Sequence, residues 1–258
     1  MRFDPGFDIA PTYDPLGFRY GAGVFGPKPE DRSLDAIRKN LLDPGCGGPE
    51  TVYSIVMDVG RKEDREIMLE RNLLYGVVTY AKGTLGREPV RSQGHIHAVS
   101  RSCGMSTCEV YEIWNGSAYI YMQETAKDNP GRCYAVYAGA GDVVIVPPGW
   151  AHATISADIT QNLTFGAWCV RDFGFDYKDV RAHKGIAWFP VVADSQIEFI
   201  ANHNYEKSRI IIKAPRVYRE FGIEKGQSIY GQFVDDPDRF LFVSRPQTAK
   251  KEWEHFVP

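Results

Sequence analysis

Two histidines separated by one residue are the first feature of the sequence that could do chemistry. They lie in the run Gly94-His95-Ile96-His97. Side chains alternate between the two faces of a strand, so on a strand His95 and His97 point the same way. Two imidazoles on one face can share a metal ion. A short His-x-His run also occurs by chance, so this interpretation depends on the residues that follow.

A glutamate and a third histidine follow at informative spacings. Glu109 opens the run EVYEIW, with six residues between it and Gly116, and a second run reads GDVVIVPPGWAH. The second run has the form Gly, five residues, Pro-x-Gly, two residues, His, and its matching residues are Gly141, Pro147, Gly149 and His152. In this order the two patterns resemble the signature motifs of the cupin superfamily, although eleven residues (98–108) separate the first pair from Glu109.

The resemblance implies a mainly β protein, a jelly-roll-like antiparallel β-barrel with a metal site inside. Such a barrel brings inward side chains from distant positions into one cavity. The expected ligands are His95, His97, Glu109 and His152. Three imidazoles and one carboxylate suit one divalent metal ion per chain and leave one or two positions open. We expect iron, with manganese, nickel or zinc as alternatives. Glu112 should face away from Glu109 and Tyr111.

A narrower resemblance covers roughly residues 50–193. The runs that carry it are YGVVTYAKGTLG, RSQGHIHAVS, EVYEIWNG, VVIVPPGWAH and RDFGFDYKDVRAHKG. They are similar to those of the cupin-type glucose-6-phosphate isomerases of archaea and some bacteria. The resemblance implies a metal-dependent aldose–ketose isomerase that acts on a sugar phosphate, with glucose 6-phosphate and fructose 6-phosphate as the expected pair.

The same resemblance assigns substrate-binding residues. Ser92 stands where the family has a phosphate-contacting Thr, and Gly94 matches a backbone contact. Tyr111 and Tyr177 match tyrosines that line the sugar pocket. Thr79 lies near the position of a further phosphate-binding Thr and is expected to replace it.

Two pocket positions differ from the family. Phe175 occupies a His position and Cys169 a Tyr position, which leaves the exact sugar phosphate open. Read without the family, a hydroxyl at Ser92, backbone N–H groups near Gly94 and the phenol of Tyr177 could bind a phosphate through neutral donors.

Isomerisation moves a hydrogen between C1 and C2 and builds negative charge on the neighbouring oxygens, which a metal ion stabilises. Glu109 is the expected carrier of the proton. A metal-bound carboxylate is a weaker base, so the roles of ligand and base are either exclusive or sequential, and a hydride shift would leave Glu109 a ligand only. Two other classes fit the same residues: a cupin Fe(II) oxygenase and a non-catalytic cupin that binds sugar phosphates.

The elements that position these residues follow from the sequence pattern. Short runs rich in Val, Ile, Tyr, Thr and Phe alternate with turn signals, so we expect a cupin barrel over 51–193. Asn115-Gly116 predicts a tight hairpin between two paired strands. An apolar stripe predicts one helix within 31–43, capped by Ser33 or Asp31.

The flanking segments are expected to belong to the same molecule. Residues 1–50 should supply an N-terminal arm and the helix, and residues 194–258, with strand-like runs SRIIIKA and FLFVSR, a β-rich extension packed on the barrel. Residues 1–30 combine prolines and glycines with aromatics, which favours an extended arm over a regular element. Such arms often cross to a partner subunit, so we expect a homodimer.

Composition excludes several classes of protein. With 30 basic and 33 acidic residues, a net charge of −3 and no dense Lys/Arg run, nucleic acid is not an expected partner. The first residues lack the character of a signal peptide, and no apolar stretch approaches the roughly 20 residues of a membrane span. We therefore expect a cytoplasmic protein without a membrane partner. Five scattered cysteines without a CxxC pair predict reduced thiols.

Overall fold

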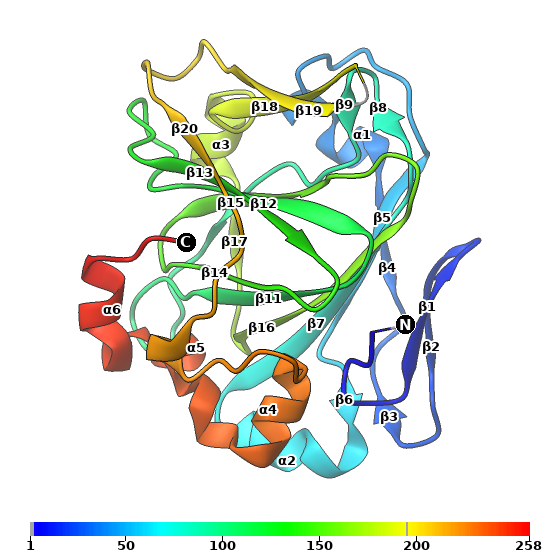
Figure 1. The fold of residues 1–258 in the computed structure, drawn as a ribbon, viewed down its shortest axis with the longest axis vertical. Coiled ribbons are helices and arrows are strands. Elements are labelled where there is room, and N and C mark those ends of the chain that lie inside the picture. Colours follow the sequence, from blue (N-terminus) through cyan, green and yellow to red (C-terminus); the bar gives the residue numbers. More distant parts are fainter. Residues whose placement is uncertain (1–2, 195) are drawn as a thin grey trace.

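Two sheets facing each other form the body of the molecule, and all their strand pairs are antiparallel except the parallel pair β13 and β20 (Figure 1). The computed structural model describes residues 3–194 and 196–258. The larger sheet has the order β14 (Val143–Val146), β11 (Glu109–Asn115), β16 (Leu163–Val170), β7 (Leu73–Tyr80), β5 (Thr51–Met57) and β4 (Glu30–Ser33). The smaller has the order β15 (Ala151–Ser156), β12 (Ser117–Gln123), β13 (Cys133–Gly139) and β20 (Ile210–Lys213). This is the predicted jelly-roll-like cupin barrel.

Shorter elements join and flank the two sheets. The short strands are β3 (Val24–Phe25), β6 (Gly60–Arg61), β8 (Thr84–Leu85), β9 (Glu88–Pro89), β10 (Ile96–His97) and β17 (Phe175–Asp176), with a hairpin of β18 (Trp188–Ala193) and β19 (Gln196–Ala201). The helices of this part are α2 (Arg65–Glu70) and α3 (Lys178–Ala182). No helix within 3–194 and 196–258 combines the length and the apolar character needed to cross a membrane.

The central strands of the larger sheet are buried on both faces, which explains their continuous apolar runs. In β7 every residue is buried. Leu74 and Val78 belong to the core between the two sheets, whereas Leu73 and Val77 belong to a second core on the outer face. A shift of one residue in this strand would therefore exchange the two faces.

The predicted hairpin at Asn115-Gly116 is wrong. Gly116 has the expected positive φ of 75°, but β11 pairs with β14 and β16 while β12 pairs with β13 and β15. Both edges of each strand are thus already occupied, and the chain passes at Gly116 from one sheet to the other. A turn signal specifies a change of direction, and tertiary pairing decides which strands meet.

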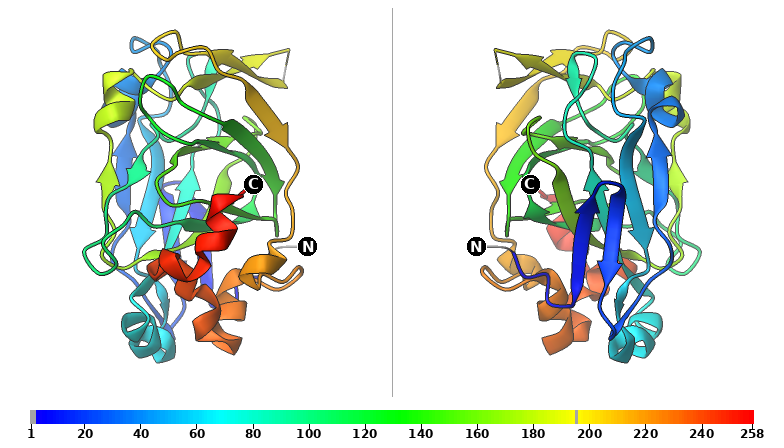
Figure 2. Two further views of the ribbon diagram at one scale, coloured as in Figure 1. Left: turned by 90° about the vertical axis from the view of Figure 1, so that its left-hand side faces the viewer. Right: turned by 90° about the vertical axis from the view of Figure 1, so that its right-hand side faces the viewer.

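The N-terminal segment is more regular than the sequence predicts. Within the described residues of 1–30, β1 (Ile9–Tyr13) and β2 (Leu16–Tyr20) form a hairpin that lies against β5 and β7 (Figure 2). The predicted helix is short, with α1 (Leu34–Ile37) followed by a 3-10 turn at 38–40. The Oγ of Ser33 accepts from the amide of Ala36 at 3.3 Å, which confirms Ser33 as the cap.

The C-terminal extension is β-rich only as far as β20. Its remainder folds into α4 (Ile229–Asp235), α5 (Leu241–Ser244) and α6 (Lys250–Glu254), so the prediction of a strand at FLFVSR is wrong. Phe240 and Val243 from this run join Trp168 of β16 in the outer core. The helices therefore cover the outer face of the larger sheet (Figure 2). Periodicity alone does not separate a short buried helix from a buried strand.

Candidate active site

The four predicted ligands meet inside the barrel. His97 ends β10, Glu109 begins β11, and His152 is the second residue of β15. His95 pairs with His152 through two backbone hydrogen bonds of 3.1 and 2.9 Å. One ligand atom from each of the four residues lies within 4.8 Å of the others, a group that could hold a metal ion.

The hydrogen bonds of His152 show why this cluster suits a cation. Its Nδ1 lies 3.0 Å from the carbonyl oxygen of Trp150, which only accepts, so Nδ1 carries the hydrogen. In the neutral ring Nε2 then holds a lone pair, and it faces Oε2 of Glu109 at 3.1 Å. Two facing lone pairs repel each other, whereas a cation shared by them removes that repulsion.

The other two imidazoles agree with this interpretation. Nε2 of His97 lies 3.1 Å from the same Oε2 of Glu109. Nε2 of His95 is buried without a hydrogen-bond partner among the described residues. Buried polar atoms are nearly always paired, so an orphaned imidazole nitrogen beside a carboxylate calls for a partner such as a metal ion. The donor set fits a divalent first-row metal.

Electrostatics favours the ligand forms of these side chains. Burial, together with the neighbouring His152 and His97, holds the pKa of His95 well below its ordinary value, so its ring is neutral. Burial alone would raise the pKa of Glu109. Hydrogen bonds and charge from His152 and His97, in the form in which their Nε2 atoms carry hydrogen, outweigh burial and hold this pKa well below its usual range, and a bound cation would take over that role. A neutral imidazole and an ionised carboxylate are the forms that bind metal.

A second pair of donors holds the Glu109 carboxylate. The hydroxyl of Tyr111 donates to Oε2 at 2.6 Å, and the thiol of Cys169 donates to Oε1 at 3.3 Å. Both side chains lie on the inner face of the larger sheet, in the core between the sheets. The ring of Phe175 packs edge-on against His95, with centroids 4.5 Å apart. The two departures from the family pattern thus lie beside Glu109 and His95.

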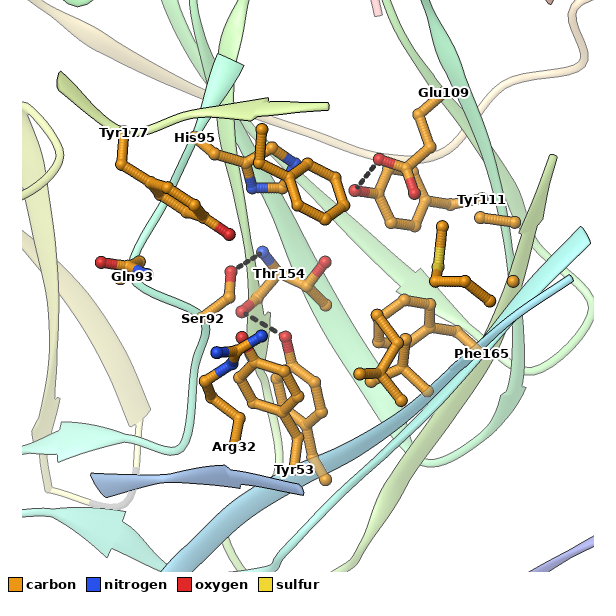
Figure 3. A pocket seen from close by; sticks show the side chains of 17 residues that line it. Arg32, Tyr53, Ser92, Gln93, His95, Glu109, Tyr111, Thr154, Phe165 and Tyr177 are labelled. Atoms are coloured by element: carbon orange, nitrogen blue, oxygen red, sulfur yellow. Dashed lines mark hydrogen bonds between the residues drawn. The ribbon is translucent and has the colours of Figure 1, made fainter. Parts of the chain in front are cut away.

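A pocket opens beside this cluster (Figure 3). Five of the residues predicted for the site line it: Ser92, His95, Glu109, Tyr111 and Tyr177. His97 and His152 lie behind them and are nearly fully buried. The structure therefore brings these predicted residues together around one pocket.

Thr79 does not reach the pocket, which corrects its assignment to the substrate. Its hydroxyl lies 3.1 Å from that of Thr164 on the other face of β7, while Val78 and Tyr80 line the pocket. Strand alternation explains the error, because Thr79 shares a face with Val77 and that face is the outer one.

Gly94 has a structural role that the structure makes visible. Its φ is +90°, and a Cβ at this position would lie 2.6 Å from Cγ2 of Ile186. Only glycine fits both conditions. Gly94 is not among the lining residues, so its backbone contact with the substrate stays a prediction.

Sequence reasoning missed several other residues that line the pocket. Arg32, Tyr53, Gln93 and Thr154 also line it. The sequence places Arg32 at the start of the predicted helix, and nothing in its local pattern indicates that it pairs as a strand residue with Tyr53. The amide of Thr154 donates to Oγ of Ser92 at 3.2 Å, so Ser92 is fixed against β15.

Glu112 faces away from the pocket, as predicted. It is fully buried, and its Oε1 accepts from the amide of Ile229 at the start of α4 at 2.9 Å. Burial raises the pKa of Glu112 from 4.5 to about 8, against the smaller effects of the hydrogen bonds that it receives. This carboxyl therefore joins the barrel to the C-terminal helices and has no part in the pocket.

The long loop 98–108 is fixed at several points. The Asp172 carboxylate accepts from the hydroxyl of Ser100 at 2.9 Å and from the amide of Ser102 at 3.0 Å. The hydroxyl of Ser106 donates to the carbonyl of His97 at 2.7 Å. The eleven-residue insertion between the ligands is thus accommodated as an anchored loop that leaves Glu109 in register.

Known proteins resemble this chain at the sequence level. It is similar to the glucose-6-phosphate isomerase of Pyrococcus horikoshii, with 26% identity over 198 residues that cover 75% of this chain and 98% of that protein. It is similar to the glucose-6-phosphate isomerase of Thermococcus kodakarensis, with 25% identity over 138 residues that cover 54% of this chain and 67% of that protein.

Solved structures match more loosely. Vicilin from Capsicum annuum has a TM-score of 0.36 at 12% identity, covering 48% of this chain and 30% of that chain. A single-residue variant of oxalate decarboxylase from B. subtilis has a TM-score of 0.30 at 18% identity, covering 48% of this chain and 24% of that chain.

A family model gives the decisive match. The model described as glucose-6-phosphate isomerase (GPI) matches residues 44–207, well over half of the chain. The matched segment contains all four candidate ligands. The chain therefore belongs to the glucose-6-phosphate isomerase (GPI) family.

Proposed function

We propose that this protein is a metal-dependent aldose–ketose isomerase that interconverts glucose 6-phosphate and fructose 6-phosphate. The observation that carries the proposal is the convergence of three imidazoles and one carboxylate, within 4.8 Å of one another, at a pocket in a chain of this family. Isomerisation needs stabilisation of negative charge at O1 and O2 and a group that moves a proton, and the cluster offers residues for both tasks.

His95, His97, Glu109 and His152 would hold the metal ion, which when bound supplies positive charge that stabilises the developing negative charge on the substrate. The chain's own residues do the rest. Tyr111 holds the Glu109 carboxylate through its 2.6 Å hydrogen bond. Glu109 carries the proton between C1 and C2, and Phe175, packed on His95, keeps water from one side of the site.

Solvent deuterium tests the role of Glu109 in proton transfer. A proton carried by a carboxylate exchanges with solvent, so isomerisation in D2O should place deuterium at C2 of glucose 6-phosphate formed from fructose 6-phosphate. Product without any deuterium would contradict this role and would leave Glu109 as a ligand in a hydride shift.

The reaction itself is tested by a metal-reconstitution assay against a panel of hexose and pentose phosphates. We expect turnover to vanish on exhaustive chelation, to return with added divalent ion, and to proceed without oxygen. Two matched variants separate the roles: His152→Ala at the cluster should lose turnover, whereas His183→Ala, a histidine outside the cluster directly after α3, should keep it. Turnover that survives chelation would refute the metal role, and oxygen consumption in place of isomerisation would refute the reaction.

A further inference from the structure

The two ends of the pocket differ in chemistry. Figure 3 shows His95, Glu109 and Tyr111 on one side of Thr154, and Arg32 on the other side, with its guanidinium turned toward Ser92. In a hexose 6-phosphate the reacting carbons C1 and C2 lie at one end of the molecule and the phosphate at the other. A substrate with its reacting carbons at the metal cluster would therefore extend its phosphate toward Arg32.

The fold holds Arg32 at this end of the pocket. Arg32 lies in β4 directly opposite Tyr53 of β5, just before an irregularity in the pairing of the two strands. The ring of Tyr53 is stacked on that of Tyr80, with centroids 5.0 Å apart. A stacked pair of buried aromatics is a rigid support, so the guanidinium starts from a fixed strand position.

Arg32 has the phenol of Tyr53 beside it but lacks the carboxylate partner that a structural arginine usually has. No carboxylate lies within 4.0 Å of it in residues 3–194 and 196–258, and its Nε is buried without a hydrogen-bond partner there. Arg91, next to the lining residue Ser92, shows the contrast, because its fully buried side chain is paired with Glu88. A guanidinium that faces a pocket without an anion is suited to an anionic ligand.

Neutral donors lie beside it. Oε1 of Gln93 accepts from Nδ2 of Asn40 at 2.7 Å and from Nε of Arg181 at 3.3 Å, which fixes the amide so that its NH2 group is free to donate. The guanidinium of Arg181 also lies over the ring of Tyr177, 4.6 Å from its centroid. Arg181 thus positions two lining side chains and adds a second positive charge behind them.

We propose that Arg32 binds the phosphate group of the substrate and makes the pocket selective for phosphorylated sugars. The inference rests on the proposed function for the identity of the sugar, but Arg32 precedes the segment 44–207 that matches the family model. Ser92 and the Gln93 amide complete the phosphate site with neutral donors, and Arg32 supplies the charge. A bidentate guanidinium–phosphate pair is among the stronger polar contacts in proteins.

The test compares Arg32→Gln with the wild type in two measurements. In metal-loaded Arg32→Gln, the KM for glucose 6-phosphate should be roughly 10- to 100-fold higher than in the wild type, with kcat nearly unchanged. A change of this size is expected for the loss of one charged hydrogen bond. In calorimetry, inorganic phosphate should bind the wild type and bind Arg32→Gln correspondingly more weakly. Arg32→Lys keeps the positive charge but not the bidentate geometry of the guanidinium, so it should recover part of the loss in KM and part of the loss in phosphate affinity.

Arg19→Gln is the matched control, because Arg19 is an exposed arginine of β2 outside this pocket. It should change neither KM nor phosphate binding. Unchanged KM and phosphate affinity in Arg32→Gln would overturn the inference, as would a loss equally large in Arg32→Lys with an altered melting temperature, which would indicate a structural role. A wild type that binds phosphate through Arg32 but isomerises no sugar phosphate would refute the proposed function and leave the phosphate site standing.

Discussion

At the scale of single residues, the hydrogen bonds of the site assign a task to each side chain. Trp150 fixes the tautomer of His152, and Tyr111 and Cys169 each hold one oxygen of Glu109. Precise placement of ligands by such contacts is a general feature of metal sites. The sequence motifs predict the candidate ligands but not these hydrogen-bond partners, because no fixed spacing links the partners to the motifs.

Removal of the Tyr111 hydroxyl tests the hydrogen bond that positions the Glu109 carboxylate. In Tyr111→Phe the carboxylate loses its 2.6 Å donor, so we expect kcat to fall about tenfold or more while the fold is kept. Tyr121→Phe is the control, because this buried phenol also loses one hydrogen bond, to Gln123, but does not contact Glu109. Steady-state kinetics should separate the two, and equal kcat values for both variants would contradict the role of Tyr111.

Gly94 offers a test of the backbone segment that carries His95 and His97. Gly94→Ala places a Cβ 2.6 Å from Ile186 at a φ of +90°, whereas Gly149→Ala meets open space at a φ of +81°. The free energy of unfolding of both variants should fall by the roughly 1–2 kcal/mol that alanine costs in a left-handed conformation, and only that of Gly94→Ala should fall further. Denaturant unfolding measures the difference, and equal losses would show that the close contact with Ile186 does not matter.

At the scale of elements, the sequence predicts local patterns better than partners. The runs of β7, β11 and β16 were recognisable as strands because their apolar residues are continuous or alternate. The pairing at Asn115-Gly116, the strand at FLFVSR and the irregular arm were predicted wrongly. Each of these depends on which surface covers the segment, and that is decided by contacts distant in sequence.

The junction between β11 and α4 should make stability depend on pH. Unfolded Glu112 ionises near pH 4.5, but the buried carboxyl ionises near pH 8, so the folded state keeps an extra proton between these values. The contribution of the protonated Glu112 to the free energy of unfolding is fully present below pH 4.5. It is lost as the pH rises to about 8, at up to about 1.4 kcal/mol per pH unit.

Glu112→Gln keeps an oxygen that accepts from Ile229 but cannot ionise. We expect its free energy of unfolding, measured by denaturant titration, to exceed that of the wild type increasingly from pH 5 to pH 8. Arg71→Gln, which removes only exposed contacts to Asp238 and Glu70, serves as a control for a surface substitution. A constant difference between Glu112→Gln and the wild type across this range would contradict the raised pKa of Glu112.

At the scale of the whole molecule, the motifs predicted the barrel and the four candidate metal ligands because both obey fixed spacings inside one domain. Arg32 and its place in the pocket could not be predicted in the same way. Arg32 comes from β4, at the edge of the larger sheet, and meets residues of β5 and β15 only in the folded chain. Its contribution depends on topology, for which the sequence carries no local signal.

The homodimer stays a prediction at this scale. The N-terminal hairpin packs on its own barrel, but β20 is an edge strand of the smaller sheet and exposes Ile211 and Ile212 by 41% and 51%. Natural proteins usually cover such edges. Light scattering should give about twice the chain mass of 29.0 kDa at micromolar concentration, and the mass of a single chain would contradict the prediction.

The number of divalent ions bound per chain, measured by equilibrium dialysis, tests the proposed metal site most directly. His95, His97, Glu109 and His152 should bind one ion, and His152→Ala should lose that ion while it keeps the fold. A wild type that binds no ion, or a His152→Ala variant that binds as many ions as the wild type with the same affinity, would contradict a metal site at these four residues.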